Sequence, residues 1–121
     1  MLNKDQILKL CDLRTKEINI PEFGGIIRIR ELTLEDAGRI YAEIQEYPEK
    51  ERGYQDIFRA VATSVIDEKD EPIFSSEEVA RLGKRFSDVV TKIYNEIIIL
   101  CGGGKNEEVE KNSEAAQTVS L

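Results

Sequence analysis

The chain has 121 residues, which is enough for one domain and too few for two comfortable ones. Its net charge of −7 argues against nucleic acid as the main partner, because phosphate binding needs clustered Lys and Arg. The sequence contains no histidine, the commonest general base, so its composition argues against an enzyme and predicts a non-catalytic protein with a charged surface.

The hydrophobic segments are too short for a membrane protein. The longest purely apolar run is Ile97 to Cys101, whereas a membrane-spanning helix needs about 20 apolar residues. The first residues lack the charged start and apolar stretch of a secretory signal, so we expect a cytoplasmic protein without a membrane partner. In that compartment, Cys11 and Cys101 are expected to be reduced, buried thiols.

The N-terminal third predicts a short helix and then a β-hairpin. Asn3, with Gln6 three residues on, is typical of a helix cap, and Ile7, Leu10 and Cys11 follow as one apolar stripe. Two segments then alternate apolar and polar residues with a period of two, which is the pattern of half-buried strands. The alternating isoleucines are Ile18 and Ile20 in the first segment and Ile27 and Ile29 in the second. Residues 21–25 contain one proline and two glycines and are expected to form the connection.

Two helices are predicted to follow the hairpin. Thr33 is expected to cap a helix that runs from about residue 34 to 47 and is stopped by Pro48. The third helix is expected from about residue 54 to 66. The apolar stripe of the second helix, expected to face the core, consists of Leu34, Ala37, Ile40, Tyr41, Ile44 and Tyr47.

The C-terminal half predicts two more helices. Ser75 and Glu78 form a capping-box pair for a fourth helix, which Gly83 is expected to end or bend. The last helix, from about Phe86 to Cys101, has the strongest helical period in the chain. Glycines at 102–104 are expected to stop it.

These elements predict an α+β fold, in which an N-terminal β-hairpin packs with about five helices. We assign residues 1–102 to a single domain. The remaining residues, 103–121, are expected to be a flexible, disordered acidic tail, because they carry four Glu and no sustained apolar period.

No cofactor or metal site is expected. Asp67 and Glu78 have the spacing of the first and last ligands of an EF-hand calcium loop. Lys69 would, however, bring a positive charge to the ion, and Pro72 stands where the sharp turn needs glycine. Glu78 is therefore better explained as the capping-box residue.

The end of the last helix holds the candidate partner-binding residues. Ile98 lies at the margin of its core stripe, and Ile99 lies nearly opposite that stripe. A helix that is apolar almost all round suggests contact on two sides, so we assign Tyr94, Ile98 and Ile99 to partner binding. The partner is a second copy of the chain, another protein or another helix of the same fold.

Three segments, in their order and spacing, resemble the small tail assembly chaperones of long-tailed phages. The resemblance covers about residues 1–112. The segments are the hairpin with Ile20-Pro21-Glu22-Phe23-Gly24-Gly25 and Arg30-Glu31-Leu32-Thr33, the stretch from Asp67 to Val79, and the Gly-rich end followed by Glu107-Glu108-Val109-Glu110-Lys111-Asn112-Ser113.

The resemblance implies a role. Such chaperones bind the long tape measure protein, help the tail tube protein polymerise around it, and leave before the virion is finished. Many members also have a longer product made by a ribosomal frameshift, and Gly104-Lys105-Asn106 can be encoded by a run of bases on which a ribosome slips. The alternative is a small structural virion protein or acidic adaptor that remains in its assembly. Self-association into a homo-oligomer is compatible with either role.

Overall fold

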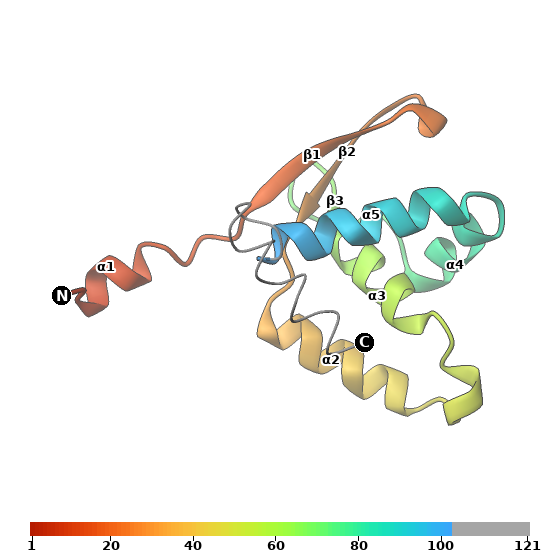
Figure 1. Cartoon of the computed structure of the whole chain (residues 1–121), viewed down its shortest axis with the longest axis horizontal. Coiled ribbons are helices and arrows are strands. Elements are labelled where there is room, and N and C mark those ends of the chain that lie inside the picture. The colour runs from red at the N-terminus through yellow and green to blue at the C-terminus, as the bar shows by residue number, and fades with distance from the viewer. Residues whose placement is uncertain (103–121) are drawn as a thin grey trace, which may run out of the picture.

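The computed structural model describes residues 1–102, and these form an α+β fold, as predicted (Figure 1). Three antiparallel strands make one sheet, and helices cover one side of it. The elements in chain order are α1 (Lys4–Leu8), β1 (Thr15–Ile20), the 3-10 turn η1 (Pro21–Phe23), β2 (Gly25–Arg30), α2 (Leu34–Gln45), the 3-10 turn η2 (Glu49–Glu51), α3 (Gln55–Ser64), β3 (Val65–Ile66), α4 (Ser76–Arg85) and α5 (Ser87–Leu100).

The predicted hairpin is confirmed, with Ile18 opposite Ile27 and Ile20 opposite Gly25. Its connection is the 3-10 turn that starts at Pro21, and Gly24 ends this turn in the left-handed region at φ 77°. The ring of Phe23 meets Phe86 edge to face, with the ring centroids 5.2 Å apart. This contact fixes the tip of the hairpin on the junction between α4 and α5.

A third strand was missed by the sequence prediction. The third helix was expected to reach residue 66, but α3 ends at Ser64, and Val65 and Ile66 form β3. Val65 lies opposite Ile29 of β2, and its carbonyl accepts a hydrogen bond from the Ile73 N–H at 3.2 Å. Pairing with strands distant in sequence therefore overrides the helical period at these two β-branched residues.

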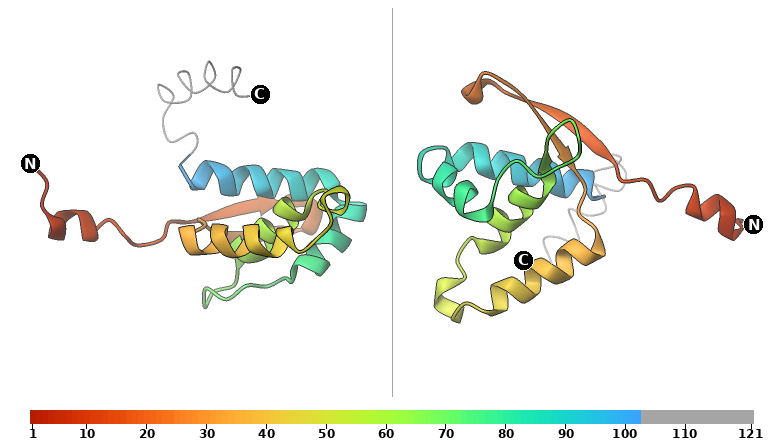
Figure 2. Two further views of the ribbon diagram at one scale, coloured as in Figure 1. Left: turned by 90° about the horizontal axis from the view of Figure 1, so that it is seen from below. Right: turned by 180° about the vertical axis from the view of Figure 1, so that it is seen from behind.

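The core lies between the sheet and the helices α3, α4 and α5, which Figure 2 shows gathered on one side of the hairpin. α5 packs on β1 and β2, while α4 packs on both α3 and α5. The most deeply buried apolar side chains come from the three strands and from α3, α4 and α5, whereas α1 and α2 contribute none of them. They are Ile20, Ile29, Val61, Val65, Ile66, Val79, Val89 and Ile97.

All three predicted helix caps are confirmed. In each, the cap side chain accepts the backbone N–H three residues on, and the side chain of that residue accepts the cap N–H. The pairs are Asn3 with Gln6, Thr33 with Asp36, and Ser75 with Glu78.

Gly83 was expected to end or bend the fourth helix, and it does not end it, because α4 continues to Arg85. The Phe86 N–H donates to the Leu82 carbonyl at 2.8 Å, which closes a helical turn beyond the glycine. A Cβ at Gly83 would lie 3.6 Å from Cε1 of Phe58, so the aromatic ring of α3 packs directly against this position.

The first helix exists as predicted but lies apart from the body of the molecule (Figures 1 and 2). Every residue from 1 to 17 is exposed, so the stripe of Ile7, Leu10 and Cys11 is not part of the core that residues 18–102 form. We call residues 1–14 the N-terminal arm.

The expected disordered tail and the slippage site fall on residues 103–121 and lie outside the described residues. Among residues 1–102, none of the helices has the length and apolar character needed to cross a membrane.

Replacing Ile97 with alanine tests the core. Ile97 is fully buried, so Ile97→Ala is expected to lower the free energy of unfolding by about 2–5 kcal/mol. Ile99→Ala is the matched control on the same helix, where 43% exposure predicts a loss below about 1 kcal/mol. Urea denaturation followed by circular dichroism measures both, and equal losses would contradict the assignment of Ile97 to the core.

Candidate interaction surfaces

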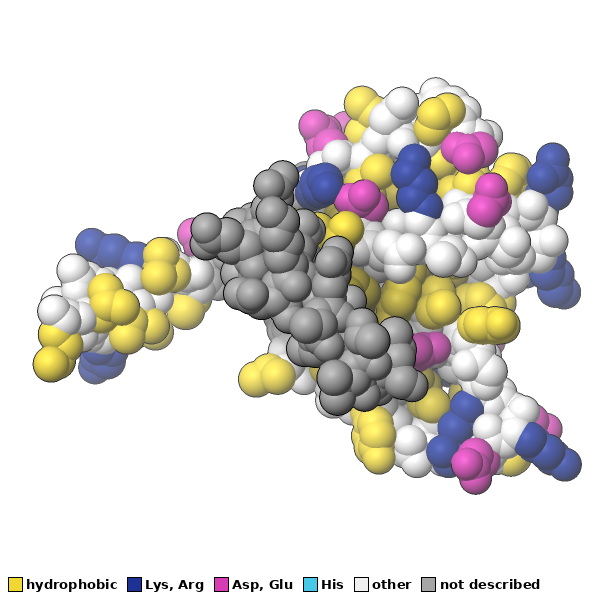
Figure 3. All heavy atoms as spheres, viewed as in Figure 1, with side chains coloured by type: hydrophobic (Ala, Val, Ile, Leu, Met, Phe, Trp, Pro, Cys, Tyr) yellow, Lys and Arg dark blue, Asp and Glu magenta, His cyan; other side chains and the backbone are white. Residues whose placement is uncertain are grey.

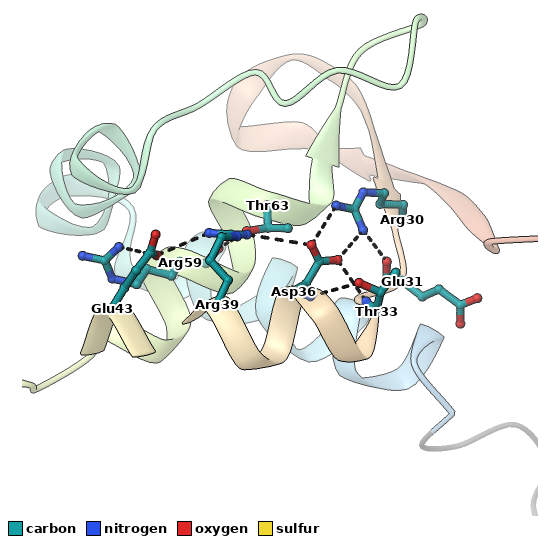
Figure 4. Close-up of polar contacts among 8 residues, drawn as sticks. All are labelled: Arg30, Glu31, Thr33, Asp36, Arg39, Glu43, Arg59 and Thr63. Carbon is teal, nitrogen blue, oxygen red and sulfur yellow. Dashed lines mark hydrogen bonds and ion pairs between the residues drawn. The ribbon is translucent and has the colours of Figure 1, made fainter. Parts of the chain in front are cut away.

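One side of α2 is held on α3 by a small set of directional contacts (Figure 4). Ile40 is its only buried residue. Around it, Arg39 Nη2 donates to Thr63 Oγ1 at 2.9 Å, and Arg59 Nη1 donates to Glu43 Oε1 at 2.8 Å. The Thr63 hydroxyl in turn donates to the Arg59 carbonyl at 2.8 Å. We call these contacts between Arg39, Glu43, Arg59 and Thr63 the polar seam.

The start of α2 is anchored to β2 by Asp36. Arg30 Nη1 donates to Asp36 Oδ2 at 2.8 Å, and the Thr33 N–H donates to the same oxygen at 2.9 Å. Burial by itself raises the pKa of Asp36, but the hydrogen bonds from Arg30 and Thr33 outweigh it, so the pKa lies below its ordinary value. Asp36 is therefore ionised at neutral pH and pairs with the Arg30 guanidinium.

This anchor predicts a loss of stability in acid. Because the pKa of Asp36 is lower in the folded state, its stabilising effect is complete above the ordinary value of 3.8 and is lost as the pH falls through the folded-state pKa. Asp36→Asn is expected to lower the free energy of unfolding at pH 7 by about 1–3 kcal/mol and to flatten its acid dependence. Urea unfolding between pH 2 and pH 7 measures this, with exposed Glu35→Gln as control; an unchanged acid slope in Asp36→Asn would contradict the anchor.

The opposite side of α2 is uncovered and carries no charge. The predicted core stripe is therefore only half correct: Ile40 faces the body, but Leu34 is 93% and Tyr41 66% exposed. Small residues lie between these two on the same side of the helix. We call this surface the α2 face, and it consists of Leu34, Ala37, Gly38, Tyr41 and Ala42, all exposed.

The candidate residues of α5 are divided between two sides of the helix. Tyr94 and Ile98 lie one turn apart on the same side, whereas Ile99 points elsewhere, because neighbouring residues do not share a helix face. Tyr94 is half-buried, and Ile98 and Ile99 are each 43% exposed. Burial, with a smaller effect of the Asp56 and Cys101 charges, raises the pKa of Tyr94, so its phenol stays protonated at neutral pH.

The C-terminal end of α5 is tied to the entry of α2 by a sulfur contact. Cys101 Sγ accepts a hydrogen bond from the Leu32 N–H at 3.2 Å. Cys101 and Cys11 are free, but both are exposed, so the expectation of buried thiols was wrong. Cys11 lies in the N-terminal arm, and Cys101 follows the last helical turn, so neither position is enclosed by the core.

Hydrophobic side chains gather between α5 and α2, and charged side chains lie around them (Figure 3). Both helices pack on α3, which holds them at a fixed separation. Apolar surface that is bordered by charge is typical of a site for another protein segment.

The two carboxylates considered as calcium ligands have structural roles. Asp67 Oδ1 accepts the Lys69 and Glu71 N–H groups at 2.7 and 3.0 Å, which shapes the turn, and Glu78 caps α4. Within residues 1–102, no three His, Cys, Asp or Glu side chains are grouped to hold a metal ion.

The arrangement of strands and helices is similar to a solved structure, that of the bacteriophage HK97 tail assembly chaperone. The chain has a tail assembly chaperone-like fold. The match covers 73% of this chain and 85% of that chain, with a TM-score of 0.53 and 20% sequence identity. The fold therefore agrees with the resemblance seen in the sequence motifs. No protein-family model and no curated protein matches the sequence.

Glycine 38 tests whether the α2 face is open. A Cβ at this position would meet nothing within 4 Å, so Gly38→Ala is expected to raise the free energy of unfolding by about 0.5–1 kcal/mol. Gly24→Ala is the control, because the φ of 77° at Gly24 predicts a loss instead. A destabilised Gly38→Ala protein in urea unfolding would show that this face is covered.

Proposed function

We propose that this protein is a phage tail assembly chaperone, which binds the tape measure protein and assists assembly of the tail tube in the host cytoplasm without catalysis. The observation that carries the proposal is the fold shared with the HK97 tail assembly chaperone. The three sequence motifs and the exposed apolar residues of α5 support it independently.

The proposed client site is the C-terminal half of α5, with Tyr94, Ile98 and Ile99 as its contacts. Tyr94 and Ile98 are spaced by one turn, as in a surface that receives an apolar helix. Ile99 extends the apolar surface around the helix end. Two sides of α5 are then available to one long helical client or to adjacent segments of it.

The exposure of these residues suits reversible binding. Full burial of an isoleucine contributes about 1.5–3 kcal/mol, but Ile98 and Ile99 are already more than half covered. Each contact therefore gains only part of that energy, and three such contacts together stay well below the roughly 8 kcal/mol of a micromolar Kd, so binding through them alone is weak. Tail tube subunits can displace a chaperone held by contacts of this strength.

The acidic character of the chain supports the same role. A net charge of −7 keeps copies apart in solution and favours solubility at high concentration. When such acidic proteins cover an aggregation-prone client, the same electrostatic repulsion keeps the complexes apart from one another.

Charge substitution on α5 tests the client site. Ile98→Asp and Ile99→Asp are each expected to lower co-purification with the tape measure protein of the same phage at least about tenfold, because an unpaired charge is costly to bury in an apolar contact. Ile26→Asp is the matched control, since Ile26 is 64% exposed on β2 and lies away from α5.

Circular dichroism establishes that each variant is folded. If Ile98→Asp and Ile99→Asp co-purify with the tape measure protein as well as Ile26→Asp does, the client site on α5 is contradicted. Mass spectrometry of mature particles tests the fate of the protein: its presence there would favour the structural virion protein or acidic adaptor over a chaperone that leaves.

A further inference from the structure

A hollow of about 350 Å³ is lined by residues of β2, α2, α3 and the start of α4. Three arginines line it, and each belongs to a different element: Arg30 ends β2, Arg39 lies on α2 and Arg59 lies on α3 (Figure 4). Three guanidinium groups therefore meet at one place in a chain whose net charge is −7. We call this place the arginine hollow.

The guanidiniums of the arginine hollow outnumber the carboxylates that pair with them. Asp36 lies 2.8 Å from Arg30 and 3.8 Å from Arg39. Glu43 lies 3.3 Å from Arg39 and 2.8 Å from Arg59. Two carboxylates therefore serve three guanidiniums, which leaves an excess of one positive charge. Arg39 shares both carboxylates at the longer distances, and 47% of its side chain is exposed, so it is the guanidinium most open to a further anion.

Hydrogen-bond donors at the arginine hollow also lack acceptors. Arg59 Nε is buried and has no hydrogen-bond partner among residues 1–102, and a buried donor without an acceptor is costly. Ser76, which lines the hollow, is the first residue of α4, where a helix leaves its N–H groups without partners. The nearby carboxylate of Glu31 pairs with Arg14, so this pair does not change the charge balance.

An excess of one positive charge matches a carboxylate better than a phosphate. A carboxylate carries one negative charge, whereas a phosphate group carries about 1.5 to 2 at neutral pH. The two oxygens of a carboxylate can accept paired N–H groups of one guanidinium. Pro72 and Phe74 also line the arginine hollow and offer apolar contact to the methylene groups of an acidic side chain. Its volume is near the lower end of the range for small-ligand sites, about 300–1,000 Å³, which suits a single side chain.

We propose that the arginine hollow is a carboxylate-binding site that receives a glutamate or aspartate side chain of an acidic peptide segment. Arg39 is its principal contact, and Ser76 at the start of α4 is the second. Glutamates of a partner protein and those of this chain beyond residue 102 carry the same group, and experiment separates these two sources. The site shares no residue with the client site on α5 and does not depend on the proposed function.

Titration of the full chain with N-acetylglutamate amide tests the site, because the side-chain carboxylate is the only charge on this probe. In ¹H–¹⁵N NMR spectra, the Arg39 Nε–H and Ser76 N–H signals are expected to shift with a saturable Kd of roughly millimolar. N-acetylglutamine amide, the uncharged matched probe, is expected to leave them in place. Equal shifts with both probes, or no shift with either, would overturn the proposal. Tighter binding of inorganic phosphate than of N-acetylglutamate amide would overturn the assignment to carboxylate.

Two substitutions are expected to change the affinity in opposite directions. Arg39→Gln leaves two guanidiniums for two carboxylates and is expected to raise the Kd at least about tenfold. Glu43→Gln leaves three guanidiniums for one carboxylate and is expected to lower the Kd at least about threefold. The Ser76 N–H signal reports binding in both variants. Arg81→Gln is the matched control, because Arg81 is exposed on α4 and does not line the hollow.

Circular dichroism establishes that these variants are folded. A cluster that only holds α2 in place would lose affinity for the probe in both variants, because both break contacts of the polar seam. A Kd that rises in Glu43→Gln as it does in Arg39→Gln would therefore overturn the proposal. Equal Kd values for Arg39→Gln and Arg81→Gln would also overturn it.

A full-length chain with Glu107, Glu108, Glu110 and Glu114 replaced by Gln identifies the source of the carboxylate. If these glutamates occupy the arginine hollow, the variant is expected to bind N-acetylglutamate amide at least about threefold more tightly than the wild type, because the competing group is gone. Equal binding by the two chains would overturn this source and assign the carboxylate to a partner protein.

Discussion

The polar seam between α2 and α3 is the constraint on which the surfaces of this molecule depend. Arg39, Thr63, Glu43 and Arg59 are joined by directional hydrogen bonds and ion pairs around the single buried residue Ile40. Contacts of this kind satisfy only the side of α2 that faces them. The residues of the opposite side, the α2 face, are uncharged and exposed.

The other described elements support these surfaces through one shared core. The sheet, α3, α4 and α5 share one core, in which Ile20, Ile29 and Ile97 are completely buried. Ile97 and its neighbour Ile98 differ in their surroundings: Ile97 secures α5 in the core, whereas Ile98 is 43% exposed. Binding residues that project from a well-packed helix lose little conformational freedom on binding, which favours reversible but specific contacts.

Local signals in the sequence predicted most elements, and long-range effects account for the errors. The caps at Thr33 and Ser75 and the period of α5 are properties of adjacent residues, so they were recognised correctly. β3 exists because Val65 pairs with Ile29, and no local pattern reveals that pairing. The stripe of α2 showed which residues share a side of the helix, but not that Leu34 and Tyr41 are left exposed by the rest of residues 1–102. The prediction that Ile98 and Ile99 lie off the core stripe of α5 agrees with their exposure, because the core side of that helix was already complete.

The central claim is that the apolar end of α5 receives a helical segment of the tape measure protein. Isoleucine-methyl NMR of the full chain, titrated with the tape measure protein of the same phage, tests it most directly. The account predicts that the Ile98 and Ile99 methyl signals shift or broaden, while those of Ile26 and Ile73, exposed on other parts of the surface, stay in place. Unchanged Ile98 and Ile99 signals in the presence of bound tape measure protein would contradict it.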